Sequence, residues 1–172
     1  SRGEELVSKQ FPELLKMGNY LSNGTVIDGE ILPFKNSKIG SFNDLQKRLG
    51  RKNVGKTTLE NSPVILKAYD LLELDNSDIR NQKYIDRRKS LEKIVFSLKN
   101  EKLQLSKYYF FNSWKEVETA HFNARINKSE GLMIKNINAF YFLSISYSKQ
   151  ALPYCISIIC VFTLERLAIW CQ

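Results

Sequence analysis

The sequence Thr-Val-Ile-Asp-Gly-Glu-Ile-Leu at residues 25–32 is the segment on which the predicted fold depends. It follows an Asn-Gly turn, it is rich in β-branched side chains, and Pro33 is predicted to close it as a strand. Alternation along a strand places Asp28 and Glu30 on one face, with isoleucines on the other. Two carboxylates on an apolar strand are costly unless a cation, a donor or water meets them, and Gly29 between them permits close approach of another backbone or a ligand. The pattern alone leaves a ligand-facing strand and a solvated edge strand equally open.

The rest of the sequence alternates short strands and helices. Residues 64–72 (Val-Ile-Leu-Lys-Ala-Tyr-Asp-Leu-Leu) are predicted to form a buried strand, and residues 130–135 (Glu-Gly-Leu-Met-Ile-Lys) another. Capping boxes, in which a serine precedes an acidic residue by three positions, predict helices that start after Ser41 and Ser113. Residues 83–99 have the spacing of an amphipathic helix, with its arginines expected largely off the apolar stripe. Short mixed elements in this order favour an α+β domain over a parallel βαβ series.

The composition is that of a globular protein with a basic surface. The chain has 172 residues, of which 43% are hydrophobic and 26% charged, and this excludes a disordered tail, a collagen or a coiled coil. A net charge of +8 favours a polyanionic partner. Because the first residue is Ser and no signal segment comes after it, we expect a processed chain or a fragment.

The charge is distributed unevenly, and this predicts a boundary near residue 138. Residues 139–172 carry only three charged residues and all three cysteines of the chain. The cysteines lack metal-ligand spacing, so a zinc site is not expected, and their odd number indicates reduced thiols in an intracellular protein. The longest nearly apolar run, residues 154–164, is well short of the roughly 20 residues that span a bilayer, so no membrane role is expected.

Residues 50–57 (Gly-Arg-Lys-Asn-Val-Gly-Lys-Thr) match the pattern GxxxxGK[ST] of phosphate-binding P-loops. That pattern binds phosphate only when a buried strand leads into the loop and a helix leaves it. Here a capped helix precedes the match, and Pro63 interrupts the segment on its C-terminal side. The match therefore predicts a basic surface loop.

Three segments, taken together, point to a family. Asp-Gly-Glu at 28–30, Ala-Tyr-Asp-Leu-Leu at 68–72 and Glu-Gly-Leu-Met-Ile-Lys at 130–135 resemble motifs III, IIIa and IV of the ATP-dependent DNA ligases, in order and at similar spacing. More broadly, they resemble the covalent nucleotidyltransferases, which include the RNA-capping enzymes. The resemblance covers residues 1 to about 138. Further stretches similar to the bacterial ligases are residues 1–6 with 11–14, 42–52 and 78–92.

This resemblance implies an adenylation domain of ATP-grasp-like α+β architecture, with antiparallel or mixed sheets and flanking helices, incomplete at both ends. In the family, a lysine attacks the α-phosphate of ATP, and the AMP then passes to the 5′-phosphate of a nick, which is sealed. The implied cofactors are ATP and Mg²⁺, and the implied partner is nicked double-stranded DNA in repair or recombination. A monomeric, cytoplasmic, nucleoid-associated bacterial protein is expected.

The resemblance also implies a role for four residues. Glu30 would contact the AMP ribose and lie near the metal, and Tyr69 would stack on adenine, where Phe is usual. Glu130 would ligate the divalent metal, and Arg2 would bind phosphate. Asp28 is treated as a supporting residue.

The sequence also departs from the family, and this leaves an alternative open. Motif I (KxDGxR), which carries the nucleophilic lysine, is absent and would lie upstream of Ser1, so no catalytic residue is assigned. Motif V is missing as well, and residues 139–172 are interpreted as an apolar non-family tail produced by a frameshift or a truncation. Lys135 is left out of the catalytic set because a regular strand would turn it away from Glu130. The chain is therefore predicted to be a ligase fragment that is inactive by itself, or else a catalytically dead nucleotide- or nucleic-acid-binding remnant.

Overall fold

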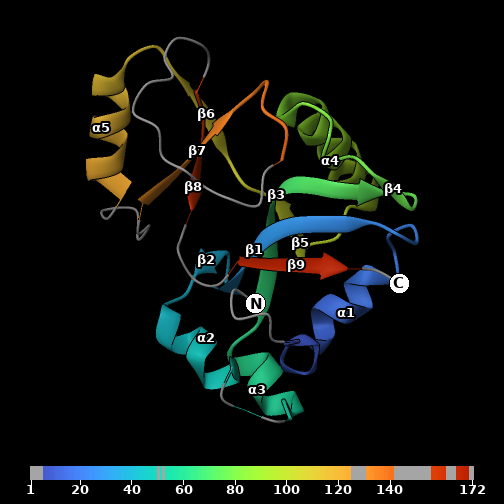
Figure 1. Ribbon diagram of the computed structural model, residues 1–172. Helices are drawn as coiled ribbons and strands as arrows, with labels where there is room; N and C mark the ends of the chain where they lie inside the picture. Colours follow the sequence, from blue (N-terminus) through green and yellow to red (C-terminus); the bar gives the residue numbers. More distant parts are fainter. Residues whose placement is uncertain are drawn as a thin grey trace.

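A computed structural model describes residues 6–49, 51, 53–124, 131–141, 156–161 and 166–170. Its α+β architecture confirms the fold class predicted from the sequence (Figure 1). Two β-sheets with flanking helices make up the described part.

The first sheet is built on a long antiparallel pair of strands, β1 (Val26–Lys35) and β3 (Val64–Leu74). The sheet order is β2-β1-β3-β4, with β9 also beside β1 and β5 parallel to β3. One face of this sheet carries the main hydrophobic core, which α1 (Pro12–Gly18) and α4 (Tyr84–Leu98) cover. The shorter strands are β2 (Lys38–Ile39), β4 (Ser77–Asp78), β5 (Leu103–Leu105) and β9 (Arg166–Trp170).

The second sheet has the order β6-β8-β7, with β8 antiparallel to both neighbours. Helix α5 lies on its outer side, where Val117 packs with Phe111 and Leu132 in a small separate cluster (Figure 1). The strands are β6 (Tyr108–Phe111), β7 (Gly131–Asn136) and β8 (Ile156–Val161), and the helix is α5 (Trp114–Ala124).

The two serine–acid boxes predicted from the sequence lie at the starts of α2 (Phe42–Leu49) and α5. In the box at the start of α2, the backbone N–H and the hydroxyl of Ser41 both donate to Asp44, at 3.1 and 2.8 Å. At α5 the backbone N–H of Glu116 donates to the hydroxyl of Ser113 at 3.3 Å. The remaining helices are the 3-10 turn Ser8–Gln10, α1 (Pro12–Gly18), α2 (Phe42–Leu49), α3 (Lys56–Asn61) and α4 (Tyr84–Leu98).

The predicted end of the first strand at Pro33 is wrong, because β1 continues to Lys35. The carbonyl of Pro33 accepts a hydrogen bond from the N–H of Gly40 at 2.9 Å. In an antiparallel ladder the N and O of one residue point to the same side, so the missing N–H of Pro33 falls where the two-residue strand β2 has already ended. The missing N–H therefore affects only the end of this ladder, where proline is tolerated.

The P-loop pattern lies between two helices. Helix α2 ends at Leu49, and Lys56 is the first residue of α3, which has only six residues. A helix precedes the pattern, as predicted, in place of the strand that a P-loop requires.

Candidate nucleotide site

Gly29 allows the two central strands to lie unusually close. A Cβ atom at Gly29 would come within 2.8 Å of Leu66 Cδ1 and 3.0 Å of the carbonyl oxygen of Lys67. The close approach that the sequence suggested at this glycine is therefore made by the backbone of β3. Because side chains alternate along a strand, Asp28 and Glu30 lie on the face of β1 opposite Ile27 and Ile31, which belong to the core.

A bulge in β3 directs Tyr69 toward the carboxylates of β1. The register passes from Asp28 opposite Asp70 to Gly29 opposite Ala68, so Tyr69 is the extra residue. Its hydroxyl donates a 2.8 Å hydrogen bond to Asp28 Oδ1, and Tyr141 Oη lies 3.4 Å from Asp28 Oδ2. The supporting role expected for Asp28 thus has a concrete form, since its carboxylate holds two tyrosine hydroxyls.

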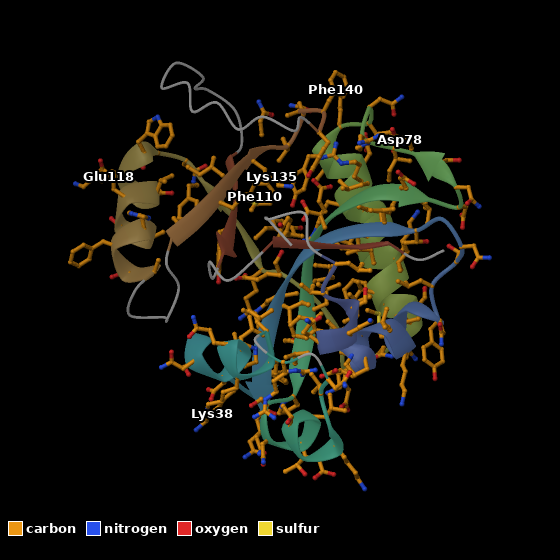
Figure 2. The ribbon with its side chains drawn as sticks, turned by 60° about the horizontal axis from the view of Figure 1, so that its bottom comes forward. Lys38, Asp78, Phe110, Glu118, Lys135 and Phe140 are labelled. Atoms are coloured by element: carbon orange, nitrogen blue, oxygen red, sulfur yellow. The ribbon has the colours of Figure 1, made fainter. Side chains whose placement is uncertain are left out.

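Lys135, from the second sheet, reaches the same place. Its Nζ lies 2.6 Å from Asp70 Oδ2 and 5.1 Å from the centre of the Tyr69 ring. The rings of Tyr84 and Tyr141 lie at 5.0 and 5.8 Å from the same atom. An ammonium group surrounded by aromatic rings gains cation–π stabilisation that grows as water is excluded. The sequence assigned Lys135 no role, and in the structure it joins the strand β7 to β3 (Figure 2).

Arg87 completes a buried charge network with Asp70. Its Nε and Nη2 atoms bind the two oxygens of Asp70, each at 2.9 Å, and its Nη1 donates to the carbonyl of Gln82. Both side chains are almost fully excluded from solvent, at 2% and 0% exposure. The expectation that the arginines of this helix lie off the buried face is therefore wrong. Arg88 is buried as well, because it donates to the backbone carbonyl of Ser106 at 2.8 Å.

Along the edge away from β1, the pairing of β3 has a gap. On that side β5 pairs with residues 66–68 and β4 with residues 73–74, and the described chain places no strand beside the residues between them. The Tyr84 hydroxyl donates to the backbone carbonyl of Tyr69 at 3.1 Å in this gap. Backbone groups that a strand would satisfy are thus partly satisfied by side chains, which is the usual solution for buried polar atoms.

Burial dominates the titration of two groups in the network. It lowers the pKa of the Lys135 ammonium below its ordinary value, and the carboxylate of Asp70 opposes that shift. Burial also raises the pKa of the Tyr84 phenol well above its ordinary value, so this tyrosine stays protonated at neutral pH.

Glu30 is buried, at 4% exposure, two residues along β1 from Asp28. Its register partners are Lys67 on β3 and Arg166 on β9. Residue 30 therefore lies in a strand that has a neighbour on each side.

The structure brings together two of the four predicted site residues. Glu30 and Tyr69 lie on neighbouring strands, on the face that also carries Asp28. Arg2 and Glu130 lie outside the described residues. Among the described residues, no group of three or more His, Cys, Asp or Glu side chains is placed to hold a metal ion.

Sequence reasoning missed Asp70, Arg87, Tyr84 and Tyr141. Asp70 belongs to the Ala-Tyr-Asp-Leu-Leu segment that was recognised, and its position inside an apolar strand is itself a signal of a buried partner. That partner, Arg87, lies 17 residues away, and nothing in the local pattern identifies it.

Comparison with known proteins identifies the family of the chain. The family model described as "ATP dependent DNA ligase domain" matches residues 1–150 of the chain. The chain belongs to this family. The ligase domain thus includes all three strands that meet at Tyr69 and Lys135, and the resemblance seen in the sequence is confirmed.

Curated relatives of this ligase domain match most of the chain. A DNA ligase of Methanococcus aeolicus is 33% identical over 147 residues, which is 82% of this chain and 25% of the relative. A probable DNA ligase of Dictyoglomus turgidum is 31% identical over the same length, covering 82% of this chain and 24% of the relative. One of Opitutus terrae is 28% identical over 163 residues, covering 79% and 16%. The chain therefore spans about a quarter or less of the relatives it matches.

Among the helices of the described part, none combines the length and the apolar character that crossing a membrane requires.

Proposed function

We propose that this chain is part of a DNA ligase and binds the adenosine of ATP with β1, β3 and β7. The observation that supports this most is the convergence of the three motif-like segments. Asp28 from the first, Tyr69 and Asp70 from the second, and Lys135 from the third are linked by hydrogen bonds and ring contacts. These positions lie up to 107 residues apart in the sequence, yet they form one connected group.

In this proposal Tyr69 stacks on adenine and Glu30 accepts a hydrogen bond from a ribose hydroxyl. The hydrogen bond to Asp28 and the nearby Lys135 ammonium fix the plane of the tyrosine ring. Because the ring is only 2% exposed, adenine reaches it by displacing a neighbouring side chain. Met133 is the candidate, since it is a partly buried, flexible side chain packed against Tyr69 and Tyr84.

We propose that Glu30, Glu130 and Arg2 bind the charged groups of ATP and the metal ion. Glu30 and Glu130 supply the carboxylate oxygens that Mg²⁺ prefers, and this ion is commonly held by one or two carboxylates together with substrate phosphates. Such an ion neutralises charge on the phosphates. Arg2 is proposed to bind phosphate of AMP or of the nick.

We propose nicked duplex DNA as the second substrate, in repair or recombination, and a monomeric cytoplasmic protein associated with the nucleoid. The motif KxDGxR does not occur in these 172 residues, so the nucleophilic lysine is not among them. This observation favours, as a second candidate, a remnant that binds nucleotide without reacting with it. In both cases the chain by itself binds ATP and is not adenylated.

ATP binding tests the proposal. Thermal shift with ATP and Mg²⁺ should give stabilisation, which Glu30→Gln reduces and Glu118→Gln, on the exposed face of α5, leaves unchanged (Figure 2). Tyr69→Phe should keep the shift, because the ring is retained, and Tyr69→Leu should lose it.

Labelled ATP followed by denaturing electrophoresis then separates binding from reaction. A chain that gives no ATP-dependent shift at all contradicts the nucleotide site. A stable labelled band would contradict the assignment of no catalytic lysine.

A further inference from the structure

A second feature of the chain, remote from Lys135, is a group of five exposed basic side chains that we call the basic patch. It lies on the β1–β2 hairpin, on α2, on α3 and on the segment between these helices. Figure 1 shows α2 and α3 at the lower end of the view, with β2 above them. Lys38 lies beside α2 (Figure 2). The basic patch consists of Lys35, Lys38, Lys47, Arg51 and Lys56.

The basic patch carries a large excess of positive charge. Residues 34–62 contain seven Lys and Arg against two Asp and Glu, whereas the whole chain has 26 against 18. Of the two acids, Asp44 pairs with Lys47 at 2.8 Å, and Glu60 is exposed. The exposed Lys89 and Lys93 of α4 share their helix with two acids, Asp86 and Glu92, of which Glu92 pairs with Arg88 at 2.9 Å.

The hairpin holds two lysines directly opposite each other. Lys35 and Lys38 are register partners on β1 and β2, and Asn36 and Ser37 form the turn with positive φ angles of 52° and 58°. Like charges opposite each other on neighbouring strands destabilise a hairpin. An anion bound between the two ammonium groups would offset this repulsion.

Arg51 is held in place by the protein. Its Nε donates to the carbonyl of Lys47 at 2.9 Å, and its Nη1 lies 3.3 Å from Thr58 Oγ1. The side chain therefore bridges the end of α2 and the helix α3. A guanidinium group that is already ordered loses less entropy when it binds a phosphate.

The distance from the candidate nucleotide site fits a duplex. Lys35 follows Glu30 by five residues on one strand, which corresponds to about 17 Å at roughly 3.4 Å per residue. Successive phosphates of one DNA strand advance by about 3.4 Å along the helix axis. Lys35, the patch residue nearest to Glu30 along the chain, is thus separated from it by roughly the length of five base-pair steps.

We propose that the basic patch binds the phosphate backbone of duplex DNA about five base pairs from the nick. This inference rests on the proposed function, because the nick is taken to lie at the nucleotide site. It also explains the P-loop pattern, whose exposed basic residues Arg51 and Lys56 then contact phosphates of DNA and not those of ATP.

The test is the salt dependence of binding to nicked duplex DNA. The variant Lys35→Gln/Lys38→Gln removes two charges, as does the control Lys89→Gln/Lys93→Gln on α4. In a plot of log affinity against log salt, each lost phosphate contact reduces the slope by about 0.9, so the patch variant should lose up to about 1.8 and the control nothing. Equal slopes for both variants would overturn the proposal.

DNA length gives an independent test. On duplexes with about twelve base pairs on each side of the nick, the patch variant should bind more weakly than the original chain, and with about four on each side the two should bind equally. An equal loss on both lengths, or a loss only on RNA duplexes, would overturn the proposal.

ATP-dependent thermal shift is measured in parallel. A chain that binds DNA in this way without binding ATP refutes the nucleotide site alone, and a patch variant that keeps full DNA affinity refutes the basic patch alone.

Discussion

The substitution Asp70→Asn removes the one charge that Arg87 and Lys135 share while preserving the shape of the side chain. Asp70 is fully buried, and it binds the guanidinium at 2.9 Å and the ammonium at 2.6 Å. The amide would leave both cations without their nearest counter-charge. Asp28 is a remaining carboxylate that favours the charged form of Lys135.

The expected loss is large for a single substitution. Removing one partner of a buried ion pair costs about 3–5 kcal/mol, because the remaining charge is buried without compensation. A domain has a total stability of only about 5–15 kcal/mol. At about 2–4 °C per kcal/mol for a chain of this size, the midpoint of thermal unfolding should fall by roughly 6–20 °C.

Urea unfolding followed by circular dichroism measures the loss, and Asp78→Asn is the matched control. Asp78 also pairs with an arginine, Arg80 at 2.7 Å, but both side chains are largely exposed, so its loss should be within error. Replacing the whole network by Asp70→Leu, Arg87→Leu and Lys135→Met should recover much of the lost stability, because apolar side chains need no counter-charge. If Asp70→Asn cost less than about 1 kcal/mol, the shared carboxylate would not be the group that compensates the two buried cations.

Three further outcomes are expected. Tyr84→Phe should cost about 0.5–1.5 kcal/mol at pH 7 through the lost hydrogen bond to Tyr69. Since burial raises the folded pKa of Tyr84, its stabilising effect is complete below the unfolded pKa of about 10 and is lost as the pH rises further, so urea unfolding should show the two proteins converging above pH 10. Gly29→Ala should cost about 1–3 kcal/mol in the same assay because its Cβ would overlap β3, whereas Gly55→Ala meets no atom within 4 Å and should avoid that steric cost. A chain ending after Tyr141 should have a higher melting midpoint than one ending after Lys135, because the backbone of Tyr141 donates to Arg80 and that of Ala139 accepts from Tyr84; equal midpoints would favour a boundary before residue 138.

Features that depend on local sequence were predicted well. The three strands and both capping boxes follow from patterns within about ten residues, and the structure contains them all. The close approach of another backbone at Gly29 was also predicted from local sequence, because only a glycine leaves room for it. The motif-like segments correctly indicated which strands meet.

Features that depend on distant partners were missed. An amphipathic pattern assigns an arginine to the solvent face because an unpaired buried cation is so costly, and Arg87 escapes this rule only through Asp70 on another element. Side-chain alternation along β7 led to the expectation that Lys135 faces away from Glu130. In the structure this side chain reaches β3, where its Nζ lies 5.1 Å from the centre of the Tyr69 ring. The bulge at Tyr69 determines which side chains of β3 share a face with those of β1. No residue pattern in β3 predicts this bulge.

The weakly charged segment after residue 138 contains two strands of the sheets, β8 and β9. From composition alone, such apolar strands look the same as the product of a change in reading frame. The strand β8 (Ile-Ser-Ile-Ile-Cys-Val) lies between β6 and β7, and β9 pairs with β1 beside Asp28 and Glu30. A strand with a neighbour on each side commits its backbone groups to both ladders, and β-branched apolar residues favour such a position. The same segment, unpaired, would be prone to aggregate, because it combines high β propensity with no charge. The apolar composition of β8 therefore suits a central strand. If the pairings of β8 and β9 contribute to the stability of the domain, the boundary does not lie near residue 138.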